Sequence, residues 1–355
     1  MLDIFYAVII ALALLIDFVY LVVLVSINLP AERTKLRKLG AVSVIIPSRN
    51  GRVIEKTLRT LRKVKRPKLE VVVVSASKET LNIARKYGAK TVRDKGVGKG
   101  AALNAAVRRA SNKILYFMDE DMIVRADTIE KVCSALDEYE VAVGYNLPEN
   151  RGTLTAGVAR LYINLLSKIQ SGLYRMIGTT LVGGRNLAIY KSTLNEVGGF
   201  KNMLTEDMEL SFKLYEKGKK VKFVNAVAFD QVPEKFSSYL KQQQRWNAGT
   251  GQVLKEWEKK LHHHDIALMT FLLLLGFLAP ISLIFLLVGL TLNSLLVLSV
   301  PLIAFLLCTS STASLGRYDL VRLPAVFFAF LFVHTFTVIY SKFSRPKGWY
   351  VTPKK

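Results

Sequence analysis

The sequence predicts an α/β fold in which a soluble domain with a mainly parallel sheet is flanked by transmembrane α-helices. Between residues 41 and 224, short apolar runs alternate with amphipathic stretches, which is typical of a parallel sheet covered by helices on both faces. Hydrophobic residues make up 51% of the chain and the mean hydropathy is +0.29, which indicates a membrane protein. The expected strands are residues 42–46, 69–74 and 114–118, and the expected intervening helices are residues 53–62, 78–87 and 99–110.

The first membrane segment, residues 4–29, is long enough to span a bilayer. Basic residues follow it directly, so the positive-inside rule predicts a cytoplasmic catalytic domain in a multi-pass plasma-membrane protein. Asp17 interrupts this segment, and an intramembrane carboxylate usually faces protein or water. Three more crossings would leave the basic carboxyl-terminal tail outside, unless one segment is interfacial or re-entrant. The later apolar segments are residues 266–290, 292–308 and 324–340.

The chain is strongly basic, with 50 Lys and Arg residues against 27 Asp and Glu residues, a net charge of +23. Without a zinc-ligand set or another nucleic-acid motif, this charge does not predict nucleic-acid binding. We attribute it to anionic lipid headgroups and a phosphate-bearing donor as partners. Cys133 and Cys308 are the two cysteines of the chain, so no disulfide framework is implied.

An acidic stretch, Asp119-Glu120-Asp121, follows the expected strand at residues 114–118. In an extended chain the side chains of Asp119 and Asp121 point to the same side. Two carboxylates at the end of a buried strand are costly unless a positive group lies between them. A hard divalent cation that shares its other positions with phosphates meets this need, whereas an isolated motif of this kind is more often a solvated acidic turn.

Two helix starts carry further candidate residues. Lys99 follows a glycine-rich loop, where backbone N–H groups and the helix dipole favour a diphosphate; a solvated lysine on a flexible loop is the alternative. Thr205 is a credible N-cap for a helix that opens with Glu206 and Asp207. That helix start takes part in chemistry only if it faces the rim of Asp119.

Downstream, Gln242, Arg245 and Trp246 are spaced so that they share one helical face. An amide, a guanidinium and an indole on one face suit a sugar, through hydrogen bonds to hydroxyl groups and stacking on the ring. Taken alone, such a trio is more often part of a surface or of the packing.

These pieces, in this order, resemble the membrane-embedded family 2 glycosyltransferases, the group that contains cellulose, chitin and hyaluronan synthases. The resemblance covers residues 41–260. Each motif is weak alone, but five or more in family order are a strong signal. The motifs are Val42-Ser43-Val44-Ile45-Ile46-Pro47-Ser48-Arg49-Asn50, Gly98-Lys99-Gly100-Ala101-Ala102-Leu103-Asn104, Asp119-Glu120-Asp121, Gly183-Gly184-Arg185-Asn186, Gly198-Gly199-Phe200, Thr205-Glu206-Asp207 and Gln242-Gln243-Gln244-Arg245-Trp246.

The resemblance implies a GT-A fold and an inverting transfer from a nucleotide-diphosphate sugar, with UDP as the expected nucleotide. Asp207 matches the general base, and Asp119 and Asp121 match the residues that contact the nucleotide and hold Mg²⁺ or Mn²⁺. The remaining matches are Pro47, Ser48, Asn50 and Lys99 for the donor, and Gln242, Arg245 and Trp246 for the acceptor.

The chain departs from the family at two positions. After the second strand the family usually carries a carboxylate that reads the nucleobase, whereas this chain has Ser75-Ala76-Ser77. Gly51 stands where the family commonly has Glu. The first departure leaves the identity of the base open.

The expected activity is extension of a polysaccharide; the alternatives are single-sugar transfer to a polyprenyl-phosphate or other lipid acceptor, and an inactive partner protein that binds nucleotide sugars. The tail 343–355 resembles the gating loop of cellulose synthases. The expected divisions are a transmembrane helix at 1–30, the GT-A domain at 41–230, interfacial helices at 231–265, membrane helices at 266–342 and the basic tail at 343–355.

Overall fold

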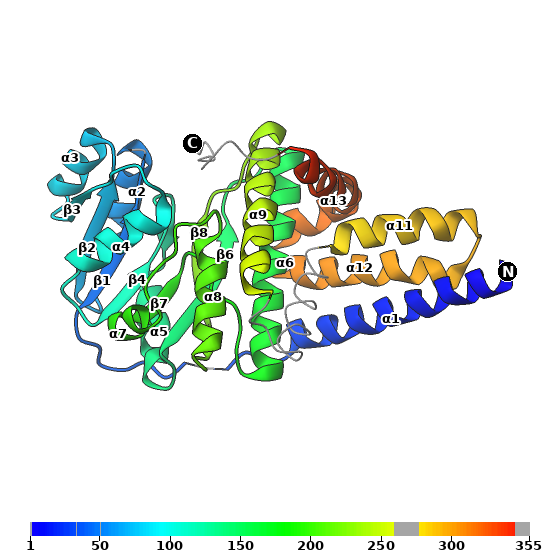
Figure 1. Ribbon diagram of the computed structural model, residues 1–355, viewed down its shortest axis with the longest axis horizontal. Coiled ribbons are helices and arrows are strands. Elements are labelled where there is room, and N and C mark those ends of the chain that lie inside the picture. Colours follow the sequence, from blue (N-terminus) through cyan, green and yellow to red (C-terminus); the bar gives the residue numbers. More distant parts are fainter. Residues whose placement is uncertain (1, 33, 50, 259–276, 345–355) are drawn as a thin grey trace.

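The computed structural model describes residues 2–32, 34–49, 51–258 and 277–344. The sheet and its covering helices form one end of the molecule, and a bundle of apolar helices projects from the other end (Figure 1). Asn50, a predicted donor residue, and the end of the basic tail beyond residue 344 lie outside the described residues.

In the described part of the chain, eight strands form one mixed sheet in the order β3-β2-β1-β4-β7-β6-β8-β5. The four strands from β3 to β4 are parallel, as predicted, and β6 pairs parallel with β8. However, β7 runs antiparallel to β4 and β6, and β5 runs antiparallel to β8. The sequence did not predict these antiparallel pairs, because short apolar runs carry no signal of strand direction. The strands are β1 (Val42–Pro47), β2 (Leu69–Ser75), β3 (Lys90–Arg93), β4 (Ile114–Phe117), β5 (Ile123–Val124), β6 (Val141–Pro148), β7 (Leu187–Tyr190) and β8 (Val221–Asp230).

Helices cover both faces of this sheet. Successive side chains of a strand point to opposite faces, so a strand that is apolar throughout needs a covering helix on each side. In β1, Ile45 packs with helix α4 in one core, whereas Val44 and Ile46 pack with helix α2 in another. The helices are α1 (Leu2–Asn28), α2 (Gly51–Leu61), α3 (Lys78–Lys86), α4 (Lys99–Arg109), α5 (Thr128–Ser134), α6 (Leu154–Ile177), α7 (Lys191–Glu196), α8 (Glu206–Glu216), α9 (Phe236–Trp257), α11 (Leu278–Thr291), α12 (Leu295–Ala313) and α13 (Arg317–Phe343), with a 3₁₀ turn at Ala135–Asp137.

The carboxyl ends of β1 and β4 meet at one rim, as expected of neighbouring parallel strands. Glu120 joins the two loops there: its side chain accepts hydrogen bonds from the Ser48 hydroxyl (2.7 Å) and the Arg49 backbone N–H (2.8 Å). Its own carbonyl accepts a hydrogen bond from the Thr57 hydroxyl at 2.6 Å. Glu120, the middle residue of the acidic stretch, therefore binds the loop after β4 to the loop after β1. Its neighbours in the sequence, Asp119 and Asp121, do not take part in these bonds.

Three described helices are long and apolar enough to cross a membrane, namely α1, α12 and α13, and α11 is a shorter apolar helix. Asp17 of α1 is 6% exposed and accepts a hydrogen bond from the Ser299 hydroxyl of α12. This carboxylate thus faces protein, one of the two environments expected for it.

Candidate active site

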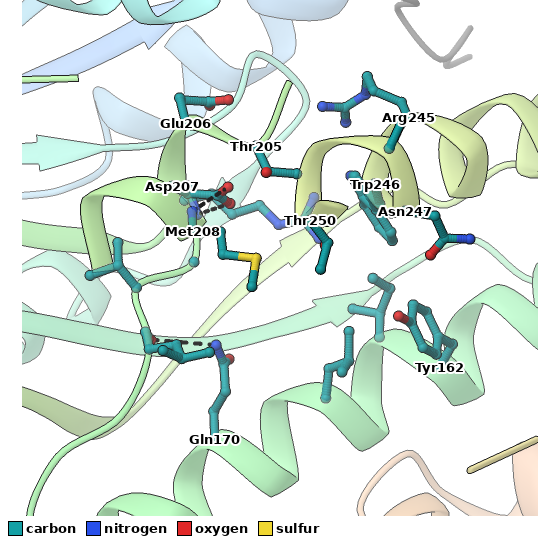
Figure 2. A pocket seen from close by; sticks show the side chains of 18 of the residues that line it. Tyr162, Gln170, Thr205, Glu206, Asp207, Met208, Arg245, Trp246, Asn247 and Thr250 are labelled. Carbon is teal, nitrogen blue, oxygen red and sulfur yellow. Dashed lines mark hydrogen bonds between the residues drawn. The ribbon is translucent and has the colours of Figure 1, made fainter. Parts of the chain in front are cut away.

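A cavity of about 600 Å³ lies where the sheet rim meets α6, α8 and α9. Figure 2 shows Asp207 and Met208 from α8, Arg245 and Trp246 from α9, and Tyr162 from α6 around it. Among the described residues, the cavity brings together five that the sequence predicted from four separate motifs. These are Lys99, Asp119, Asp207, Arg245 and Trp246.

Lys99 is the first residue of α4 and its side chain is largely buried, so it is not a solvated lysine. Its Nζ lies 2.8 Å from Glu206 Oε1 and 3.5 Å from Asp119 Oδ1. Burial alone would lower the pKa of Lys99, but the surrounding carboxylates outweigh burial and raise it. The preceding Gly98 has φ +140°, and a Cβ there would lie 2.0 Å from the Asn202 side chain, so the loop requires glycine.

Arg185 connects the rim to the end of β8. One guanidinium nitrogen lies 2.7 Å from Asp230 Oδ2 and 3.7 Å from Asp119 Oδ2. Burial opposes the charge of Arg185, but Asp230 and the other nearby carboxylates raise its pKa. Asp230 is 1% exposed, so this pair is a buried one that loses most of its hydration.

Asp207 lies in the first turn of α8, and each of its carboxylate oxygens accepts a backbone hydrogen bond. Oδ2 accepts the N–H of Gly184 and Oδ1 accepts the N–H of Met208, both at 2.9 Å. A Cβ at Gly184 would lie 3.0 Å from Asp207 Oδ2, so a glycine allows the two loops to approach closely. Thr205 occupies the N-cap position of α8, as expected, but its side chain makes no capping hydrogen bond. The helix start faces the rim of Asp119, which is the condition that the sequence left open.

The other acid of this helix start, Glu206, is 2% exposed. Burial raises the pKa of Glu206, while the ammonium of Lys99 opposes that rise. Because Lys99 touches both Glu206 and Asp119, its position is set before any ligand binds.

On α9, Arg245 donates a hydrogen bond to the Leu204 carbonyl at 2.9 Å, and burial lowers its pKa. The ring of Trp246 lies 6.2 Å from that of Tyr162, centroid to centroid. Gln242, which the sequence placed with them, is buried at 9% exposure and is absent from the described lining of the cavity. Two of the three predicted acceptor residues therefore reach the cavity.

The other predicted donor residues that the structure describes lie at the rim outside this lining. Asp121 is 6% exposed, and its Oδ2 accepts the N–H of Gln231 at 3.2 Å. Ser48 is held by Glu120, and Pro47 ends β1. Ser75, where the family usually has a carboxylate, is buried and accepts the N–H of Ser77 through its hydroxyl at 3.1 Å.

The charges around the rim fit a divalent cation. Within the described residues, no group of three or more His, Cys, Asp or Glu side chains forms a metal site. However, Mg²⁺ and Mn²⁺ are commonly held by one or two carboxylates and take their other ligands from water and phosphates. Five carboxylates gather here against three cationic side chains, so the cluster is short of positive charge; the five are Asp119, Asp121, Glu206, Asp207 and Asp230, and the three are Lys99, Arg185 and Arg245.

Sequence reasoning gave no role to Arg185, Glu206 or Asp230. Arg185 was noted only as part of the Gly183-Gly184-Arg185-Asn186 motif, and Glu206 only as part of the Thr205-Glu206-Asp207 motif at a helix start. Asp230 carried no local signal, since its contact with Arg185 depends on the meeting of β8 with the loop before β7.

Two family models and several curated proteins match this chain. A sequence model of glycosyl transferase family group 2 matches residues 114–313, and one of the MobA-like NTP transferase domain matches residues 38–182. The chain is 26% identical over 257 residues to the probable glycosyltransferase YdaM of Bacillus subtilis, covering 64% of this chain and 59% of YdaM. It is 27% identical over 223 residues to the poly-β-1,6-N-acetyl-D-glucosamine synthase of Staphylococcus aureus, covering 57% of this chain and 52% of that protein. The chain thus spans between half and three-fifths of these relatives' lengths.

Among solved structures, the mannosyltransferase PcManGT from Pyrobaculum calidifontis matches 96% of this chain and 100% of its own, with a TM-score of 0.56 at 18% identity. At that identity the likeness shows the fold alone, a GT-A-like α/β fold with a mixed sheet. The family model covers more than half of the chain, including the acidic rim, Asp207 and the helix with Arg245 and Trp246. The chain therefore belongs to glycosyl transferase family group 2.

Proposed function

We propose that this protein transfers a sugar, with inversion at the anomeric carbon, from a nucleotide-diphosphate sugar to a hydroxyl group of an acceptor held in the cavity. The observation that carries the proposal is the cavity itself, in which a buried charged cluster and the Asp207 carboxylate open into one space. A diphosphate that brings a divalent cation suits this cluster, since the lysine and arginine side chains pair with phosphate oxygens and the cation supplies the positive charge that the carboxylates lack.

The donor diphosphate would bind near Lys99 and Arg185, and the nucleoside near the loop of Pro47 and Ser48. The structural neighbour PcManGT was solved with GDP-mannose and Mn²⁺, which supports a donor and a metal of these classes. For this chain we propose Mg²⁺ or Mn²⁺ held by Asp121 and Asp119. Bound there, the cation would neutralise the charge that develops on the departing diphosphate.

Asp207 is proposed as the general base. The acceptor oxygen attacks the anomeric carbon, its proton passes to the Asp207 carboxylate, and the bond between that carbon and the diphosphate oxygen breaks. The nucleoside diphosphate leaves with the bonding electrons. Two backbone N–H groups hold the carboxylate in place, so its orientation is fixed before the acceptor binds.

A lipid-linked acceptor is the class that the lining favours. Away from the charged cluster the cavity is walled mainly by aliphatic and aromatic side chains of α6, α9 and α13 and of the residue before α11, which suit an apolar chain. Polar side chains such as Gln170 and Asn247 stand among them and could meet sugar hydroxyl groups. These helices adjoin the apolar bundle, so such an acceptor could arrive from the cytoplasmic leaflet of the plasma membrane. The apolar lining includes Ile163, Leu166, Ile169, Leu254, Phe277 and Val338.

Extension of a polysaccharide is the second candidate. It is favoured by Trp246 beside Tyr162, which could stack on a sugar ring, and by the relative in Staphylococcus aureus named as a poly-β-1,6-N-acetyl-D-glucosamine synthase. A lipid-linked sugar satisfies both observations if its sugar stacks there and its chain follows the apolar wall.

The test is sugar transfer by the purified protein in lipid nanodiscs, with Mn²⁺ or Mg²⁺ and a panel of UDP- and GDP-sugars. Polyprenyl phosphate, a glycolipid and a free oligosaccharide are supplied separately, and products are sized by mass spectrometry. One added sugar on a lipid supports the first candidate, and a ladder of lengths supports the second. Donor binding without transfer to any of the three acceptors would contradict both.

A further inference from the structure

We propose that Asp230 and Glu206 are positioning residues of the donor site. Each acid holds one cationic side chain in place, so that Arg185 and Lys99 can exchange Asp119 for the donor diphosphate and keep their orientation. The inference rests on the proposed function, because it takes the diphosphate of a nucleotide sugar as the ligand of these two cations. The sequence alone gave a role to neither acid.

Each of the two cationic side chains has one close partner and one more distant partner. Arg185 lies 2.7 Å from Asp230 Oδ2 but 3.7 Å from Asp119 Oδ2. Lys99 lies 2.8 Å from Glu206 Oε1 but 3.5 Å from Asp119 Oδ1. The cations therefore flank Asp119, one at each carboxylate oxygen. The contact with Asp119 is the weaker of the two that each cation makes, since attraction between charges falls with distance.

The close and the distant partners also differ in exposure. The side chains of Asp230 and Glu206 are 1% and 3% exposed, whereas that of Asp119 is 23% exposed. A buried acid that lost its cation would keep an uncompensated charge away from water, which is strongly unfavourable. Asp119 can instead be compensated by water or by a divalent cation. A ligand that enters the cavity is therefore expected to displace Asp119 from the two cations and to leave the buried pairs intact.

Asp230 belongs to a fixed part of the fold. It is the last residue of β8, and its backbone carbonyl accepts the N–H of Glu149 at 2.8 Å. The next N–H along the chain, that of Gln231, binds Asp121 Oδ2 at 3.2 Å. The end of β8 thus holds Arg185 through a side chain and Asp121 through the backbone, which are a proposed donor contact and a proposed ligand of the cation.

Glu206 is fixed by the contact between two helices. It is the first residue of α8, directly after Thr205 (Figure 2). At Gly249 of α9, a Cβ would lie 2.5 Å from the Thr205 side chain, so the two helices are in close contact there. The Arg245 side chain of α9 also donates to the carbonyl of Leu204 at 2.9 Å. The start of α8 is therefore held against α9, and Glu206 directs Lys99 from a rigid support.

This arrangement favours the joint binding of a divalent cation and a diphosphate over the binding of either alone. A bare divalent cation at Asp119 would meet the positive charges of Lys99 and Arg185, and a bare diphosphate would meet the carboxylates. Lys99 and Arg185 leave Asp119 when phosphate oxygens replace it, and Asp119 then becomes available to the cation. The cation and the nucleoside diphosphate should therefore each strengthen the binding of the other.

The test is nucleotide binding by the full chain in nanodiscs, measured by calorimetry with UDP and with GDP in the presence of Mn²⁺. Asp230→Asn and Glu206→Gln each remove a negative charge and keep the shape of the side chain. Glu209→Gln is the matched control. Glu209 lies on α8, is also 2% exposed and pairs with Lys213 at 3.1 Å, but it is absent from the described lining of the cavity.

Asp230→Asn and Glu206→Gln should each weaken nucleotide binding by about tenfold, because each leaves one cation without its close partner. Electrostatics alone predicts the opposite sign, since the loss of a negative charge near a phosphate strengthens anion binding. Glu209→Gln should change the nucleotide affinity by less than about twofold. Nucleotide binding that is unchanged or tighter in both site variants would overturn the proposal.

A double-mutant cycle separates positioning from a general loss of structure. In an Arg185→Gln background, Asp230→Asn should weaken nucleotide binding little further, since Asp230 acts through Arg185. An equal loss in both backgrounds would overturn the proposal.

Mn²⁺ binding without nucleotide gives a second measurement, from the electron paramagnetic resonance signal of the free ion. Arg185→Gln should raise the affinity for Mn²⁺, because it removes a cation from Asp119, whereas Asp230→Asn should lower it. No rise with Arg185→Gln would contradict the exchange at Asp119. Wild-type protein that binds neither nucleotide in the presence of Mn²⁺ would contradict the proposed function itself, whereas equal nucleotide binding by wild type and variants contradicts only the positioning.

Discussion

The two ends of the cavity differ in the elements that build them. The charged end comes from the loops at the carboxyl ends of strands and from the starts of α4 and α8, where the positive end of the helix dipole favours anions. The apolar end comes from the sides of α6, α9 and α13, and α6 and α13 also pack against the apolar bundle through α12. One space thus has a polar end, where we propose that the donor binds, and an apolar end, where we propose that a lipid-linked acceptor binds.

The charged end is costly to build, which indicates a purpose other than stability. Glu206 and Asp230 are each at most 2% exposed, and ion pairs at such depth often contribute little net stability because both partners lose hydration. Five carboxylates near three cations also repel one another in the absence of a ligand. The apolar end carries no such cost. Changes at the two ends should therefore affect different steps of the reaction.

The largest effect is expected from Asp207→Asn. Loss of the proposed base should lower kcat by about 10³-fold, while the affinity for donor stays within about twofold, because the amide cannot take the acceptor's proton. Single-turnover transfer and calorimetric donor binding measure the two quantities. Asp127→Asn, at an exposed carboxylate paired with Lys131 outside the cavity lining, is the matched control and should leave both unchanged. Turnover of Asp207→Asn at the wild-type rate would remove Asp207 from the mechanism.

A smaller effect, on acceptor binding rather than on kcat, is expected from Trp246→Ala. If Trp246 positions the acceptor, its loss should raise the acceptor KM by about tenfold, on the order of 1.4 kcal/mol, and leave donor affinity within about twofold. Trp246→Phe keeps a ring beside Tyr162 and should restore most of the acceptor affinity. Equal losses for donor and acceptor would mean that the two ends of the cavity do not act separately.

The sequence predicted the charged end better than the apolar end. Strand ends are local features, and parallel pairing brings them to one rim, so Lys99, Asp119 and Asp207 were found from their own motifs. The ion pair between Arg185 and Asp230 joins positions 45 residues apart and has no local signature. The apolar wall escaped notice for a related reason: a leucine that lines a cavity and one that fills a core have the same periodicity along a helix.

The same limit applies to the membrane helices. Length and hydropathy make α13 a candidate span, but they give no sign of the residues that bind it to the other helices. Polar residues along α13 bind α6 and α9, as Asp319 and Ser341 do. Those partners are on α6 and α9, more than ninety residues away in the chain.

The smallest effect is expected at a polar cluster on the opposite edge of the sheet, where charge serves stability. Glu70, near the start of β2, pairs with Lys90 and accepts hydrogen bonds from the Ser43 hydroxyl and, at 2.8 Å, the Ser111 N–H. Burial would raise the pKa of Glu70, but these partners outweigh burial and lower it to about 2. Because the folded-state pKa lies below the ordinary value of 4.5, the ionised group stabilises the fold fully above pH 4.5, and that contribution is lost as the pH falls toward 2.

Glu70→Gln should therefore lower the unfolding free energy at pH 7 by about 1–2 kcal/mol, which corresponds to roughly 2–4 °C in Tm. The difference from wild type should shrink as the pH is lowered below 4.5, and thermal unfolding in nanodiscs across this range measures it. Transfer activity at pH 7 should stay within about twofold of wild type, since Glu70 is far in the fold from the strand ends that carry the cavity. A loss of turnover with an unchanged Tm would contradict this assignment, because it would mean that Glu70 serves catalysis and not stability.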